Sequence, residues 1–190
     1  MNEITCNYVP VDSIPKLLEE KIYGLVESCF SDKEKTPEEK KEHNDKFCSA
    51  GDRTGFTLAT LDSEVIGAAI AYKRVIKYKG KDITLGGIGG VCTKENFRRR
   101  GIATRLNKMV MEKLKDADCD VAYLCTDTNK LGKLYGFAGF QKLKEKYTYL
   151  GRSGKRYYDG GGMIAPIASS EIFQKIVNSN ESFDLGVGDW

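Results

Sequence analysis

The chain of 190 residues is poor in histidine and tryptophan, with one of each, His43 and Trp190. No two of its six cysteines have the two-residue gap of zinc or thioredoxin motifs, so we expect reduced thiols and no metal site. No run approaches the roughly 18 apolar residues that cross a membrane. The first residues also lack a basic start followed by an apolar stretch. These absences favour a soluble cytoplasmic protein with no membrane partner.

An excess of charge of one sign is also missing. The 30 basic residues are interspersed with 27 acidic ones, and the net charge of +3 is too small to indicate a nucleic-acid-binding protein. With 41% apolar residues, a chain of this length can bury one substantial core. We therefore expect a single domain over residues 1–190.

Apolar residues at helical spacing predict the helices. The clearest case is an amphipathic helix over 101–115, where Ile102, Leu106, Val110 and Leu114 recur every four residues. Further helices are expected between 14 and 30, over 130–138 and from about 170 to 177. One more helix is expected to start at Thr36-Pro37-Glu38-Glu39. Here Thr36 would be the N-cap, Pro37 would lie in the first turn and Glu39 would complete a capping box.

Runs rich in β-branched and aromatic residues predict the strands. They cover 56–61, 65–72, 74–78, 83–93 and 120–125, and turn residues separate several of them. The first four form a meander of antiparallel hairpins, whereas 86–125 has the order strand, helix, parallel strand. We therefore expect an α+β fold in which one twisted, mixed sheet is flanked by helices.

The most informative segment is the hexamer Arg98-Arg99-Arg100-Gly101-Ile102-Ala103, which lies between a predicted strand and a predicted helix. The first N–H groups of a helix have no internal partners and can bind a pyrophosphate, which the helix dipole also favours. Gly101 allows close approach of the backbone, and the arginines add charge suited to phosphate oxygens. Taken alone, the hexamer could also be a solvated basic helix start.

The order of motifs around this loop makes the interpretation specific. Val91-Cys92-Thr93 precedes the loop, and Leu134-Tyr135-Gly136-Phe137-Ala138-Gly139-Phe140 follows one strand later. In this order the sequence resembles the GNAT superfamily of acetyl-CoA-dependent N-acetyltransferases, most closely over 83–142. The resemblance implies a GNAT-type fold, acetyl-CoA as co-substrate and no metal. Because related enzymes are often dimers, it is also compatible with a homodimer.

The resemblance also implies roles for individual residues. Val91, Cys92 and Thr93 would contact the pantetheine arm through their backbone, and the Val91 N–H would polarise the thioester carbonyl. The pyrophosphate would be held by the loop and helix start, which comprise Arg98, Arg99, Arg100, Gly101, Ile102, Ala103 and Thr104. Tyr135 would be the catalytic acid that protonates the departing thiolate. The alternative for Tyr135 is a core aromatic residue packed against Phe137 and Phe140.

The general base cannot be assigned from the sequence. Many relatives carry a glutamate two residues before the position of Val91, where this chain has Gly89 within Gly86-Gly87-Ile88-Gly89-Gly90. Four glycines in five residues weaken a strand, so they indicate close approach of substrate or cofactor, or else a distorted sheet.

The tail of the chain suggests the acceptor. The terminal Gly188-Asp189-Trp190 resembles aminoglycoside 2′-N-acetyltransferases, in which a carboxylate on a final tryptophan and an adjacent aspartate lie beside the acceptor amine. Trp190 would then be catalytic, and the carboxylates of Asp189, Asp159, Asp32 and Glu39 would bind a polycation. The expected function is acetyl transfer to a primary amine of a small polycationic acceptor such as an aminoglycoside. The alternatives are a polyamine or peptide acceptor, or an acetyl-CoA-binding protein without turnover.

Overall fold

The computed structural model describes residues 3–30 and 36–190. Within these residues the largest element is a sheet of seven strands in the order β1, β2, β3, β4, β5, β9, β6. In that order they span Thr5–Pro10, Arg53–Leu61, Glu64–Tyr78, Lys81–Thr93, Val121–Cys125, Gly162–Pro166 and Gln141–Lys142. Neighbours are antiparallel except β4 and β5, which are parallel. The predicted α+β fold with one mixed sheet is confirmed.

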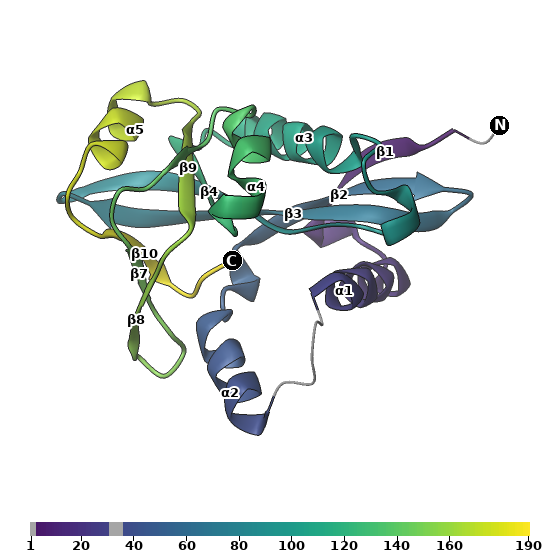
Figure 1. Ribbon diagram of the computed structural model, residues 1–190, viewed down its shortest axis with the longest axis horizontal. Coiled ribbons are helices and arrows are strands. Elements are labelled where there is room, and N and C mark those ends of the chain that lie inside the picture. Colours follow the sequence, from purple (N-terminus) through teal and green to yellow (C-terminus); the bar gives the residue numbers. More distant parts are fainter. Residues whose placement is uncertain (1–2, 31–35) are drawn as a thin grey trace.

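Helices cover both faces of this sheet, with α3 and α1 on opposite sides (Figure 1). The helices are α1 (Lys16–Phe30), α2 (Pro37–Lys46), α3 (Ile102–Asp116), α4 (Thr128–Gly136) and α5 (Ser170–Val177). Leu106 and Val110 of α3 pack into one core cluster, whereas Ile22 of α1 belongs to a second cluster with Phe56 of β2. The apolar stripe predicted for 101–115 therefore faces the sheet, as expected for an amphipathic helix.

Two local predictions can be compared with the structure directly. The capping box at the start of α2 is confirmed, because Thr36 Oγ1 accepts from the Glu39 N–H at 3.2 Å and Glu39 Oε2 accepts from the Thr36 N–H at 2.8 Å. The runs 65–72 and 74–78, predicted as separate strands, form one strand, β3. From Tyr72 onward its residues alternate between more and less exposed positions, because only one face of this half is well covered. In the described ranges, no helix is long and apolar enough to span a bilayer.

A second, smaller sheet was not expected from the sequence. It contains β10 (Phe183–Val187), β7 (Tyr147–Leu150) and β8 (Arg156–Asp159), with β7 between the other two. β10 runs parallel to β7, and β8 runs antiparallel to it. The chain leaves β10 toward the middle of the large sheet, where its C-terminal end lies (Figure 1). The small sheet thus brings the last residues close to β4 and β5.

Candidate active site

The two parallel strands of the large sheet diverge. β4 and β5 pair at only three positions, which are Leu85–Val121, Gly86–Ala122 and Gly87–Tyr123. Beyond Gly87, β4 continues for six residues paired with β3, while the end of β5 stays paired with β9. The facing edges of Ile88–Thr93 and of Leu124 and Cys125 are therefore not paired with each other. Such an opening offers unpaired backbone groups to an extended ligand.

A β-bulge changes the direction of β4 inside this opening. Ala68 of β3 pairs with Cys92 and Ile70 pairs with Gly89, so that both Gly90 and Val91 lie opposite Ala69. Gly90 has φ of +58°, a conformation that favours glycine. A bulge bends its strand and re-aims the residues that follow. Here those residues are Cys92 and Thr93, and the Thr93 Oγ1 is buried with no hydrogen-bond partner among the described residues.

The arginine-rich loop leads from β4 into α3. Arg99 has φ of +62° and Gly101 has φ of +74°, so both adopt the left-handed conformation immediately before the helix. A side chain at Gly101 would meet no atom within 4 Å, so this glycine serves the backbone conformation. Arg98 Nε donates to the Thr93 carbonyl at 3.1 Å and ties the loop to β4.

The start of α3 has the properties of an anion site. The first hydrogen bond of the helix runs from the Arg105 N–H to the Gly101 carbonyl at 3.0 Å. The N–H groups of the residues before Arg105 have no acceptor within the helix and can bind an anion. Arg98, Arg99, Arg100, Gly101 and Thr104 are exposed, Ala103 is half-buried and Ile102 is buried. Backbone donors, the helix dipole and arginines therefore lie together at a surface that phosphates can reach.

Tyr135 lies on α4 and is buried. Its ring packs edge-on against Phe140 at 6.1 Å between centroids, whereas Phe137 is 93% exposed and takes no part in the core. Burial raises the pKa of the Tyr135 hydroxyl, and hydrogen bonding with Asn107 of α3 partly offsets this. The hydroxyl therefore keeps its proton at neutral pH and could donate it. Its contact with Phe140 is compatible with both the acid role and the core role.

The glycine-rich part of β4 faces the chain's own tail. A Cβ atom at Gly87 would lie 2.1 Å from Trp190 Cε3, and one at Gly89 would lie 3.3 Å from the main-chain carbonyl carbon of Trp190. The indole ring stacks on Tyr72 at 5.4 Å and is covered by the Arg74 guanidinium at 4.2 Å. Two glycines of this run therefore make room for Trp190, while Gly90 forms the bulge. The distortion of the sheet is thus observed at Gly90, whereas the segment that approaches Gly87 closely is the chain's own tail, and approach of a substrate or cofactor stays a prediction.

The residue before Trp190 has a hydrogen-bonded environment that the sequence did not indicate. The Asp189 carboxylate is 2% exposed, and it accepts from the Tyr147 hydroxyl at 2.8 Å, the Tyr123 hydroxyl at 3.4 Å and the Trp190 N–H at 2.9 Å. Burial raises its pKa to about 6, against the lowering effect of these hydrogen bonds. Ser49 Oγ donates to the Asp189 carbonyl at 2.5 Å and fixes the main chain.

The remaining predicted acceptor residues are spread out. Asp159, at the end of β8, is half-buried and accepts from the Tyr149 hydroxyl at 2.5 Å, and the Lys46 ammonium lies 3.6 Å from the same oxygen. Glu39 is exposed at the start of α2, where it caps the helix. Asp32 falls outside the described residues. The structure thus brings Asp159, Asp189 and Trp190 into one region.

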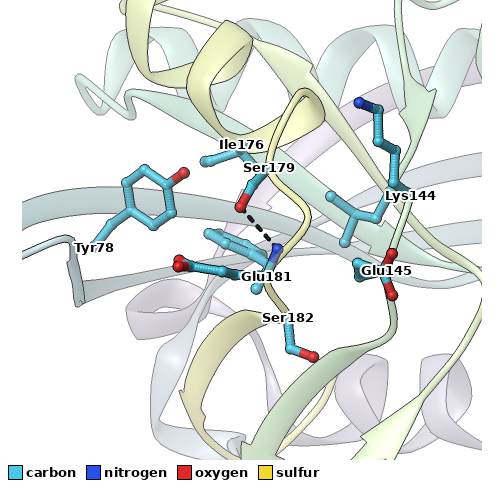
Figure 2. A pocket seen from close by; sticks show the side chains of 9 residues that line it. Tyr78, Lys144, Glu145, Ile176, Ser179, Glu181 and Ser182 are labelled. Carbon is cyan, nitrogen blue, oxygen red and sulfur yellow. Dashed lines mark hydrogen bonds between the residues drawn. The ribbon is translucent and has the colours of Figure 1, made fainter.

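A separate, shallow pocket lies near the turn end of β3 and the end of α5 (Figure 2). Tyr78, Lys144, Glu145, Ser179 and Glu181 are among its lining residues, and the Glu181 N–H donates to Ser179 Oγ at 3.1 Å. None of the residues predicted for acetyl transfer belongs to this pocket.

Comparisons with solved structures agree with this architecture. A GNAT family N-acetyltransferase from Escherichia coli, YhbS in complex with CoA, is 18% identical with a TM-score of 0.63, and the match covers 98% of this chain and 90% of that one. Escherichia coli ElaA is 18% identical with a TM-score of 0.59, over 86% of this chain and 99% of that one. A GCN5-related N-acetyltransferase from Kribbella flavida is 17% identical with a TM-score of 0.54, over 76% of this chain. This chain spans only 35% of that longer protein.

Sequence comparisons identify the family. No curated protein matches the chain. The sequence model of the acetyltransferase (GNAT) domain matches residues 12–141, which is more than half of the chain and includes the diverging strands and the arginine loop. The chain therefore belongs to the GNAT family of acetyltransferases.

Proposed function

We propose that this protein transfers the acetyl group of acetyl-CoA to a primary amine of a small polycationic acceptor. The observation that carries the proposal is the opening between β4 and β5, which leads directly to the exposed start of α3. An extended arm with a pyrophosphate at one end suits this combination. The CoA-bound structure of YhbS, which shares the fold, supports the same ligand class.

The residues present fit acetyl-CoA. The backbone of Val91, Cys92 and Thr93 borders the opening, and the buried Thr93 hydroxyl has no hydrogen-bond partner among the described residues. Residues 98–104 supply the helix start, the left-handed glycine and the arginines for the pyrophosphate. When bound, acetyl-CoA contributes an activated thioester and a thiolate leaving group.

The proposed chemistry is direct attack by a neutral amine. The Val91 N–H would donate to the oxygen that becomes negative as the tetrahedral intermediate forms. Tyr135, whose raised pKa keeps it protonated, would give its proton to the departing sulfur. Loss of such an acid lowers rates by about 100-fold or more.

The charges around the tail support a cationic acceptor. The half-buried Asp159 already has a lysine ammonium at 3.6 Å, so this region binds a cationic amine of the chain itself. The buried Asp189 adds negative charge to the same region. A carboxylate on Trp190, which a chain ending there would carry, would lie against Gly89. Aminoglycosides, with several ammonium groups on a compact frame, match these charges.

Release of the CoA thiol provides the test. We expect thiol release when kanamycin or tobramycin is added to the protein with acetyl-CoA, and a loss of about 100-fold in kcat for Tyr135→Phe with unchanged acetyl-CoA binding. Release with spermidine or a peptide amine only would move the acceptor to the polyamine or peptide class. Tight acetyl-CoA binding without turnover of any amine would refute the proposal.

A further inference from the structure

A chain of hydrogen-bonding groups connects buried Asp189 to the open edge of β5. The Tyr147 hydroxyl lies 2.8 Å from Asp189 Oδ2 and 3.0 Å from Cys125 Sγ. Cys125 is the last residue of β5, two residues beyond the last pairing of β5 with β4. Part of the residue is exposed, while its thiol lies among Tyr123, Tyr147 and Asp189. The sulfur therefore stands where the two strands diverge, and Tyr147 links it to the carboxylate through the shortest contacts. The Tyr123 hydroxyl, 3.4 Å from Asp189 Oδ1, also interacts with Cys125.

The direction of the hydrogen bonds follows from the chemistry of the three groups. A carboxylate can only accept, so the single proton of Tyr147 belongs to its bond with Asp189. The phenol oxygen can then accept from the Cys125 thiol at 3.0 Å, whose other acceptor is the Gly160 carbonyl at 4.0 Å. Burial raises the pKa of Tyr147 and, to about 11, that of Cys125, so both hold their protons at neutral pH. The thiol therefore donates to the phenol, and the phenol donates to the carboxylate.

The surroundings of Asp189 leave its charge uncompensated by an ion pair. Among the described residues, no lysine, arginine or histidine nitrogen lies within 4.0 Å of its carboxylate. The nearby Arg74 is occupied by Asp52 at 2.7 Å and by two backbone carbonyls. The other titratable or charged groups that act on or face this carboxylate come from β3, β5, β7 and β8 and are Tyr72, Arg74, Tyr123, Cys125, Tyr147, Tyr149 and Asp159.

We propose that Asp189 is the proton acceptor of the acetyl-transfer reaction and that Tyr147 and Cys125 relay the proton to it. This assignment rests on the amine acetyltransferase activity proposed above. It supplies the base that Gly89 cannot, from a carboxylate on the same side of β4 as the Trp190 main chain. A carboxylate that is ionised at pH 7 but whose pKa is about 6 is well matched to this task.

The proton balance of the relay is simple. The acceptor's ammonium loses a proton to Cys125 Sγ as the thiol proton passes to the Tyr147 oxygen and the phenol proton passes to Asp189 Oδ2. The amine is then neutral and can form the new N–C bond while the C–S bond of the thioester breaks. Asp189 ends protonated, and Tyr147 and Cys125 end unchanged. The reverse path returns the proton to solvent after product leaves.

Four variants and one control test the relay, with tobramycin as acceptor and thiol release as readout. Asp189→Asn and Tyr147→Phe should each lower kcat by about 100-fold. Both should abolish an acidic limb near pH 6 in the kcat profile, and the KM for acetyl-CoA should change less than about twofold. Cys125→Ala should lower kcat by about tenfold or more, whereas Cys125→Ser, which retains a relaying hydroxyl, should stay within about threefold of the parent.

Tyr157→Phe is the matched control. Tyr157 belongs to the same small sheet, and its hydroxyl likewise donates to an aspartate, Asp45, at 2.8 Å, but it does not contact Asp189. Its variant should keep the parent kcat and pH profile. Equal rates for Cys125→Ala and Cys125→Ser, or an unchanged acidic limb in Tyr147→Phe, would overturn the relay even if Asp189→Asn fails to fold. Absence of turnover in the parent protein would instead refute the proposed function.

Discussion

Replacing Gly87 by alanine should dislodge Trp190 from β4. An added Cβ would lie 2.1 Å from Cε3 and 2.3 Å from Cζ3 of the indole, and the ring is held between Tyr72 and Arg74. Because the Cβ is fixed to the strand, the ring has to leave its site. Its departure would expose a side chain that is now 9% exposed. We expect the free energy of unfolding to fall by about 3–5 kcal/mol, the usual cost of losing a buried aromatic contact.

A double-mutant cycle separates this effect from others. Trp190→Ala alone should cost about as much as Gly87→Ala. In the Trp190→Ala background, Gly87→Ala should be neutral or stabilising by about 0.5–1 kcal/mol, since alanine suits a strand interior better than glycine. Denaturant unfolding followed by circular dichroism gives the free energy of unfolding of the parent, both single variants and the double variant. Emission from Trp190, the single tryptophan, should shift to longer wavelength in Gly87→Ala.

Gly86→Ala provides the matched control for the cycle. Its Cβ would point to the opposite face, where it meets Leu114 Cδ1 at 2.8 Å. Its cost should therefore add to that of Trp190→Ala within about 0.5 kcal/mol. If the cost of Gly87→Ala is the same with and without the indole, then Trp190 does not fill this space and the explanation of the glycine run fails.

Three further results are expected. Because the folded-state pKa of Asp189 is about 6 against 3.8 for the free group, its contribution to stability is full below pH 3.8 and is lost as pH rises through 6. This loss is about 3 kcal/mol, and the difference in unfolding free energy between the parent and Asp189→Asn should follow it between pH 4 and 7. Gly101→Val, which forces a β-branched residue to φ of +74°, should raise the KM for acetyl-CoA about tenfold in initial-rate assays while kcat changes little. Arg74→Met removes donors to the Leu185 and Gly188 carbonyls and should red-shift Trp190 emission, and an unshifted spectrum would show that these bonds do not hold the tail.

The unit of β4, α3 and β5 could be predicted from local patterns. The helix expected over 101–115 is observed as Ile102–Asp116, and the strand expected over 120–125 as Val121–Cys125. In both cases the spacing of apolar residues along a continuous segment predicts which residues are buried. The loop between strand and helix followed for the same reason, because its glycine and arginines are adjacent in sequence.

The small sheet and the contacts of the tail could not be predicted in the same way. Strands β7 and β8 have four residues each, too few for a clear period, and their contacts join residues far apart in the chain. The Tyr147–Asp189 bond spans 42 positions, and the Tyr157–Asp45 bond spans 112. Tyr147 and Tyr149 alternate along β7, but nothing near them in the sequence indicates which carboxylates they contact.

The glycine at position 89 and the carboxylate at 189 are best understood together. A Cβ at position 89 would start 3.0 Å from Tyr72 Cε2 and 3.3 Å from the Trp190 main-chain carbonyl carbon, so these neighbours would have to shift by a small amount. A glutamate there would compete with the docked tail for the same space. In the proposed relay, the base is instead a carboxylate of the tail itself, Asp189, whose neighbour Trp190 occupies the space beside Gly89.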